Sequence, residues 1–183
     1  MTKDDEALAL AASKGDSMAF ETLLRRHYDR MFTLSWRLMG NYHEAQDLTQ
    51  DLCLALPRKL AGWRGEAKFT TWLYRIVLNA SHDRRRSAEA RSRNHSQWGD
   101  WELARQASNA EAAEARDWMR LALATLAPDL RETAALILDA EMKQAQVAEI
   151  LDIPAGTVAW RMSEVKRHLR LHAAQETEGH HGG

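Results

Sequence analysis

The sequence predicts an all-α protein in which two small helical domains are joined by a flexible linker, the C-terminal domain being a helix-turn-helix. Three features of the 183 residues support this fold class. Apolar residues recur at three- and four-residue steps along most of the chain, whereas the alternation typical of strands is nearly absent. This periodicity fades between about residues 87 and 115, and a break at Pro154 separates two helical patterns near the C-terminus. We expect domains at residues 1–90 and 116–175, a linker at 91–115 and a disordered tail at 176–183.

The N-terminal domain is expected to contain three long helices. The first begins near Asp16 and stops at Gly40, a pairing of cap and stop residues that is typical of helix ends. Asn41, in a sequence that resembles a capping box, opens the second helix, which Pro57 is expected to close. A glycine-containing loop follows. The third helix then carries an apolar stripe through residues 72–80 and runs into three consecutive arginines at 84–86.

The C-terminal domain is expected to hold shorter helices at about residues 116–126, 128–140, 144–151 and 156–173. In the last of these, Val158, Met162, Val165 and Leu169 fall on one apolar stripe, which turns Trp160 outward. A short helix, a tight turn and an amphipathic helix with a basic end are typical of a helix-turn-helix, which offers its second helix to the major groove of DNA.

Net charge is −1, which by itself argues against nucleic-acid binding, but the charges are unevenly distributed. Residues 58–93 contain ten basic and three acidic side chains, and residues 156–172 are also basic. Two basic islands in an otherwise acidic chain indicate two separate surfaces that bind phosphate. The alternative for such charge runs is an ordinary solvated face.

Other classes of protein find little support. The sequence contains no run of about 18 apolar residues, so no membrane span is predicted. Cys53 has no second cysteine with which to form a disulfide, and a cytoplasmic location is expected. No nucleophile arrangement or glycine-rich phosphate loop indicates an enzyme or a cofactor. His168 and His172 lie four residues apart, but no third ligand is near in sequence, so we expect no metal site.

Three blocks, in order along the chain, carry a family resemblance. Residues 43–51 (HEAQDLTQD), residues 69–79 (FTTWLYRIVLN) with the arginines beyond them, and residues 150–158 (ILDIPAGTV) followed by Arg161 resemble successive motifs of one family. That family is the extracytoplasmic-function sigma factors, small two-domain specificity subunits of bacterial RNA polymerase. The resemblance covers roughly residues 7–172. It implies a DNA-binding subunit that is not an enzyme, with core RNA polymerase and promoter DNA as partners.

The first block implies the polymerase contact. Glu44, Asp47 and Asp51 lie at i, i+3 and i+7 of a helix, with Gln50 and Leu54 beside them and an apolar leucine side opposite. A stripe of this kind suits a basic partner helix. The resemblance implies that the stripe docks on the polymerase clamp, and a merely solvated face is the alternative.

The second block implies promoter melting and recognition of the −10 element. Aromatic and cationic groups along one helix suit single-stranded DNA, because bases stack on rings while phosphates are neutralised. In the family, the loop before this helix (about residues 60–68 here) builds a pocket for a base that leaves the stack. Trp72 is equally explained as a core residue. The candidate residues are Arg64, Lys68, Trp72, Arg75, Asn79, Asp83, Arg84, Arg85 and Arg86.

The third block implies recognition of the −35 element by the final helix. Its candidate residues are Thr157, Ala159, Trp160, Arg161, Ser163, Glu164, Lys166 and Arg167. The family often carries Arg, Lys or Ser at the outward positions, whereas this chain has Ala159, Trp160 and Glu164. The resemblance therefore does not imply which upstream sequence is read.

Regulation by an anti-sigma factor is also implied, because relatives are held inactive by a partner that packs between their two domains. Two other functions are weighed against this one. An ordinary helix-turn-helix regulator would leave the acidic stripe and the third helix unexplained. A sigma-like decoy that sequesters an anti-sigma factor tends to lose the basic promoter-reading groups, which residues 58–93 retain.

Overall fold

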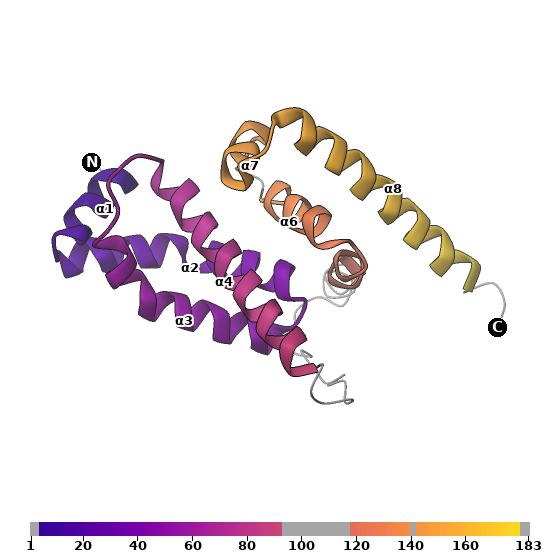
Figure 1. Cartoon of the computed structure of the whole chain (residues 1–183), viewed down its shortest axis with the longest axis horizontal. Helices are drawn as coiled ribbons and strands as arrows, with labels where there is room; N and C mark the ends of the chain where they lie inside the picture. The colour runs from indigo at the N-terminus through magenta and orange to yellow at the C-terminus, as the bar shows by residue number, and fades with distance from the viewer. Residues whose placement is uncertain (1–3, 93–117, 140–141, 180–183) are drawn as a thin grey trace. The chain divides into compact units, whose positions relative to one another are not determined.

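The computed structural model describes residues 4–92, 118–139 and 142–179. The regular elements among these residues are α-helices, as the sequence predicts (Figure 1). The chain divides into two compact units, Met1–Leu103 and Ala104–Gly183. The expected linker lies outside the described residues except at its start, where the fourth helix continues to Ser92.

Unit 1 is built from four helices: α1 (Asp5–Ser13), α2 (Ser17–Met39), α3 (Tyr42–Leu60) and α4 (Phe69–Ser92). The boundaries of α2 are those expected, because the Asp16 side chain accepts hydrogen bonds from the backbone N–H groups of Met18 and Ala19. At the other end, Gly40 takes a left-handed conformation with φ 71°, which glycine adopts without steric cost. Asn41 caps α3 by accepting from the Glu44 N–H.

The core of unit 1 forms between the apolar sides of its helices. Leu48, Leu52 and Leu56 of α3 are buried, and so are Leu23 and Met31 of α2. Burying the leucine side of α3 leaves its acidic side in solvent. The apolar stripe read from the sequence therefore fixes which residues of α3 are open to a partner.

The expected end of the second helix at Pro57 is wrong. Pro57 lies inside α3, which continues to Leu60. A proline removes one backbone donor, and here that donor belongs to the last turns of a long helix. Leu60 is almost fully buried, so packing of the final turn favours continuing the helix.

Unit 2 contains α6 (Pro128–Ile137), α7 (Gln144–Leu151) and α8 (Ala155–Gly179), and residues 118–124 are also helical. Pro128 occupies the first turn of α6, as expected. Arg131 of α6 donates hydrogen bonds to the carbonyl oxygens of Leu123, Ala124 and Leu126 at the end of the preceding helix. These bonds satisfy carbonyls that would otherwise lack partners.

The predicted helix-turn-helix is formed by α7, a turn and α8 (Figure 1). Asp152 makes the turn in a left-handed conformation with φ 53°. Val158 and Val165 of α8 are buried, and Met162 and Leu169 pack against the same core, so the predicted stripe is confirmed. The α8 helix reaches Gly179, so residues 176–179 are helical and do not belong to a disordered tail.

Candidate functional site

The acidic stripe consists of Glu44, Asp47, Gln50, Asp51 and Leu54, and the structure brings all five to the exposed side of α3. Leu54 is 81% exposed, the largest value among the exposed large hydrophobic residues of the described chain. An exposed apolar side chain at the end of a row of carboxylates offers a partner both an apolar and a charged contact. That composition is typical of a protein–protein interface.

Asp51 of the acidic stripe is already engaged within unit 1. Its Oδ2 lies 2.5 Å from Nη2 of Arg84, which comes from α4. The pair therefore joins a candidate polymerase-binding residue to a candidate DNA-binding residue. The Asp51 side chain is 68% exposed and that of Arg84 is 30% exposed, so water and ions screen the attraction and a competing charge can displace either partner.

The loop between α3 and α4 spans residues 61–68, and an aromatic cluster lies beneath it. Trp63 is buried, and its ring meets that of Phe69 edge-on with centroids 6.4 Å apart. Phe69 also packs on Trp72, with ring centroids 5.7 Å apart. Trp72 is half-buried, which agrees with its interpretation as a core residue. Arg64 and Lys68 are exposed on the loop.

Farther along α4, the remaining candidates lie at different depths. Asn79, Asp83 and Arg86 are exposed, whereas Arg75, Arg84 and Arg85 are half-buried. Arg86 forms an ion pair with Asp83, one turn earlier on the same helix. Since Arg84 pairs with Asp51, two members of the arginine triplet (Arg84, Arg85 and Arg86) have carboxylate partners in the free protein. Phosphate competes with those carboxylates for the two arginines.

The outer face of α8 comprises Ala159, Trp160, Ser163, Lys166 and Arg167, all exposed, with Thr157 and Glu164 partly covered. Trp160 is 59% exposed. Arg167 Nη2 lies 2.8 Å from Oε2 of Glu164, and the hydrogen bonds from Arg167 hold the pKa of the Glu164 carboxyl below its usual range. The face therefore presents an indole, a hydroxyl, the ammonium group of Lys166 and a guanidinium group paired with a carboxylate.

Arg161, which flanks that face, is largely covered. Its side chain is only 18% exposed and forms an ion pair with Asp129 of α6, with Nε 3.5 Å from Oδ2. Its Nη1 lies 3.5 Å from the Thr133 hydroxyl. Because Arg161 is three residues from Val158 and four from Val165, it borders the buried stripe and reaches the neighbouring helix. These contacts link α8 to α6.

A network around α1 was not predicted from the sequence. Asp5 Oδ1 lies 2.7 Å from Nη1 of Arg26, and Asp5 Oδ2 lies 2.8 Å from Nε2 of His27, so α1 is tied to α2. The next residue, Glu6, accepts a hydrogen bond of 3.2 Å from the backbone N–H of Phe69, the first residue of α4. The available signal was Asp4 followed by Asp5 and Glu6, an acidic first turn typical of a helix start.

The acidity of Asp5 reflects this network. Burial raises the pKa of the Asp5 carboxyl, but the hydrogen bonds and charges of Arg26 and His27 outweigh burial and leave the pKa below its usual range. His27 is buried, and its ring meets Phe69 edge-on with centroids 5.3 Å apart. The ionised Asp5 is therefore the form that the fold stabilises.

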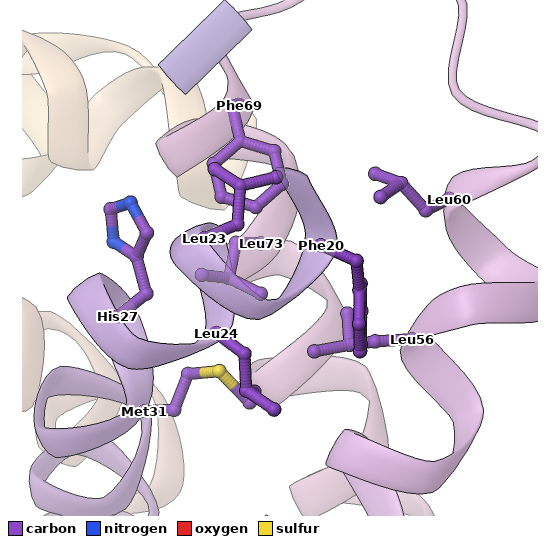
Figure 2. A pocket seen from close by; sticks show the side chains of 9 residues that line it. All are labelled: Phe20, Leu23, Leu24, His27, Met31, Leu56, Leu60, Phe69 and Leu73. Carbon is purple, nitrogen blue, oxygen red and sulfur yellow. The ribbon is translucent and has the colours of Figure 1, made fainter. Parts of the chain in front are cut away.

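An apolar pocket lies inside unit 1, beside this network (Figure 2). It is lined by Phe20, Leu23, Leu24, His27, Met31, Leu56, Leu60, Phe69 and Leu73. His27 is the one lining residue with an ionisable side chain. A hollow of this composition is a gap in the packing of α2, α3 and α4, and it offers no set of converging polar groups for a cofactor.

Within the described ranges, no group of three metal-ligating side chains comes together. Cys53 is half-buried, and burial raises the pKa of its thiol, which keeps it protonated and a poor nucleophile. Among the helices that the structure describes, none combines the length and the apolarity needed to cross a membrane.

Solved structures share this fold. The chain aligns with CnrH, from its structure in complex with the cytosolic domain of CnrY, with a TM-score of 0.69 and 24% identity over 93% of this chain and 97% of CnrH. It also aligns with the sigma factor RpoE from its co-crystal structure with the anti-sigma factor NepR of Bartonella quintana, with a TM-score of 0.71 and 20% identity over 82% and 94% of the two chains.

Sequence comparisons identify the family. The model of sigma-70 region 2 matches residues 23–91. The ECF RNA polymerase sigma factor SigW of Bacillus subtilis (strain 168) is 27% identical over 86% of this chain and 90% of its own. The ECF RNA polymerase sigma factor SigM of Mycobacterium tuberculosis (strain ATCC 25618 / H37Rv) is 30% identical over 91% of this chain and 83% of its own. With its two helical units and its C-terminal helix-turn-helix, the chain belongs to the extracytoplasmic-function (ECF) family of RNA polymerase sigma factors.

Proposed function

We propose that this sigma factor docks on core RNA polymerase through the acidic stripe of α3. The observation that carries the proposal is the exposure of Leu54 on the same face of α3 as the carboxylates of Glu44, Asp47 and Asp51. An apolar side chain held in water gains free energy when a partner covers it, and the carboxylates select a partner with basic side chains around that spot. RNA synthesis itself is assigned to the polymerase, with which the chain works in the cytoplasm.

The test is a binding measurement between core polymerase and a charge-reversed chain. The double variant Asp47→Lys, Asp51→Lys should lose core binding by more than about tenfold, since like charges then face each other across the interface. Helicity measured by circular dichroism should not change, because both residues are exposed. Asp29→Lys, which reverses an exposed carboxylate of α2, is the matched control and should bind like the wild type. Core binding that survives the double reversal would contradict the assignment.

The proposed promoter contacts form two groups, one on each unit. Single-stranded DNA of the −10 region is assigned to the loop 61–68 and α4, where cationic side chains follow a buried aromatic cluster. Duplex DNA of the −35 region is assigned to the outer face of α8, whose exposed short polar and basic side chains suit the major groove. We assign these two contacts to the domains expected at residues 1–90 and 116–175.

Transcription from a library of random promoter sequences tests both contacts. Core polymerase loaded with the chain should initiate from a subset that shares two sequence elements, and core alone should not. Trp160→Ala and Ser163→Ala should change the preferred upstream element and leave the downstream one intact. A sigma-like decoy would show no promoter selection with any core polymerase, and a simple regulator would not change the start sites of core polymerase.

We further propose that an anti-sigma factor holds the chain inactive. Sigma factor RpoE, similar in fold, was crystallised with the anti-sigma factor NepR. In this chain, Leu54 of the acidic stripe and Trp160 of α8 are the exposed apolar groups that such a partner would cover, with well over about 2,000 Å² buried in total. Capture of the chain from its native cell should recover a protein that inhibits transcription in vitro. Recovery of polymerase subunits alone, with full activity of the free chain under all conditions, would contradict this proposal.

A further inference from the structure

Helix α4 begins without a capping side chain of its own. The carbonyl of Lys68 accepts the first bond of the helix, from the N–H of Trp72, so Lys68 occupies the N-cap position. The ammonium group of lysine carries donors only and cannot accept a hydrogen bond from the free N–H groups of the first turn. Serine, threonine, aspartate and asparagine are the residues that usually supply this acceptor.

An acceptor for the first of these N–H groups comes from α1. Glu6 Oε1 accepts the Phe69 N–H at 3.2 Å, across 63 positions of sequence. A carboxylate at this place also faces the positive end of the helix dipole. The preceding residue, Asp5, is bonded to Arg26 and His27 of α2, so the first turn of α1 is itself held in position. The start of α4 is thus fixed by a cap that is anchored in another part of unit 1.

This cap lies at the end of the loop 61–68. Phe69, whose N–H Glu6 accepts, is buried and packs against both Trp63 of the loop and Trp72 of α4. Fixing Phe69 therefore fixes the aromatic floor of the loop and the direction in which its exposed Arg64 and Lys68 leave the backbone. We propose that Glu6 is a positioning residue for capture of an unstacked promoter base, acting through the N-terminus of α4. This inference rests on the proposed function of the loop.

The experiment measures how much one base contributes to binding. Polymerase holoenzyme formed with the full chain is titrated with single-stranded oligonucleotides of the −10 region, intact or made abasic at one position at a time. The position whose loss weakens wild-type binding most marks the captured base. Glu6→Ala should reduce the ratio of abasic to intact dissociation constants by about fivefold, the factor that loss of a typical helix cap corresponds to. Affinity for core polymerase should stay the same.

Two further variants separate positioning from general damage. Asp4→Ala removes a neighbouring exposed carboxylate whose side chain caps nothing, and its ratio should equal that of the wild type. Glu6→Gln keeps a neutral oxygen that can accept the Phe69 N–H, so its ratio should lie between those of Glu6→Ala and the wild type.

Several results would overturn the inference. These are an unchanged ratio in Glu6→Ala, with or without an equal loss of affinity for both oligonucleotides, or a ratio in Glu6→Gln that falls below that of Glu6→Ala. If Glu6→Ala does not fold, Glu6→Gln is compared instead. Its neutral oxygen accepts a weaker bond, so the ratio should fall by less, and an unchanged ratio would overturn the inference. If the wild type itself does not distinguish intact from abasic oligonucleotides, the proposed function of the loop fails instead.

Discussion

Adjacent residues of α8 have opposite environments. Trp160 is exposed to solvent, whereas Arg161 reaches Asp129 of α6 and is largely covered. The side chains of consecutive helical residues point about 100° apart, so a residue next to an outward position can border the core. Mutating the two residues one at a time distinguishes contacts with DNA or a partner from the stability of unit 2.

Arg161→Ala should destabilise unit 2 by about 1–2 kcal/mol. The substitution removes the packing of the arginine stem and leaves Asp129 without its cation. Hydrogen exchange of the α6 backbone amides measures this effect and should become faster by the corresponding factor of about 5–30.

Trp160→Ala is the control for that prediction. Its ring lies in solvent, so exchange in α6 should stay at the wild-type rate, while selection of the upstream promoter element changes. Faster exchange in the Trp160 variant would contradict this prediction. So would a wild-type exchange rate in the Arg161 variant.

The exposure of a side chain could be predicted where the helical pattern alone determines it. The exposure of Leu54 and Asp47 followed from the buried leucines at the opposite side of α3. The pairing of Arg161 with Asp129 and of Arg84 with Asp51 was not predictable, because each joins two helices whose relative rotation the sequence pattern leaves open. A long arginine beside an apolar stripe can turn toward solvent or toward a neighbour.

At the scale of whole elements, the carboxylate of Asp5 helps to hold α1 against α2. The pKa of Asp5 is lower in the folded protein than in the unfolded chain, where it is about 3.9. The unfolded chain therefore takes up the proton first as pH falls. The stability that Asp5 contributes is complete above about pH 5 and is lost as pH drops through 4 to the lower folded value.

Asp5→Asn should therefore lower stability near neutral pH by about 1–2 kcal/mol, because hydrogen bonds to a charged group are lost. Its stability should also fall less steeply than that of the wild type between about pH 5 and pH 2. Urea unfolding at a series of pH values measures both effects. Asp4→Asn is the control, and a wild-type slope in the Asp5 variant would mean that another group dominates the acid transition.

Element boundaries were predictable where a local signal dominates. Asp16 and Gly40 set the ends of α2 through contacts with their own helix. The boundary predicted at Pro57 was wrong because the burial of Leu60, a tertiary effect, outweighs one missing backbone donor. Helix α1 was missed since its apolar stripe is short, and its position depends on bonds from Asp5 and Glu6 to distant helices.

For the molecule as a whole, the charge distribution predicts how DNA affinity responds to salt. Each lysine or arginine that neutralises a phosphate contributes close to one unit to the slope of log affinity against log salt. Replacing Arg84, Arg85 and Arg86 together by alanine should lower that slope by up to about three units. The reduction should be smaller than three if Asp51 and Asp83 compete with phosphate for their arginines.

The measurement is a titration of promoter DNA with holoenzyme between about 50 and 200 mM salt. Arg25→Ala removes an exposed arginine of α2 that is paired with Glu21, outside the proposed DNA surface, and should leave the slope unchanged. An unchanged slope in the triple variant would mean that the arginine triplet is a solvated cluster without phosphate contacts.

The Asp51–Arg84 pair has one more consequence, because its partners belong to surfaces assigned to different macromolecules. If a basic side chain of polymerase pairs with Asp51, Arg84 becomes available to bind a phosphate. If a phosphate binds Arg84, Asp51 becomes available to polymerase. The two binding events are then thermodynamically linked, and the linkage is reciprocal: each raises the affinity of the other by the same factor. For a pair this exposed the factor is at most about five. Binding of polymerase to unit 1 would thus raise the affinity of unit 1 for DNA through two side chains, with no change of fold.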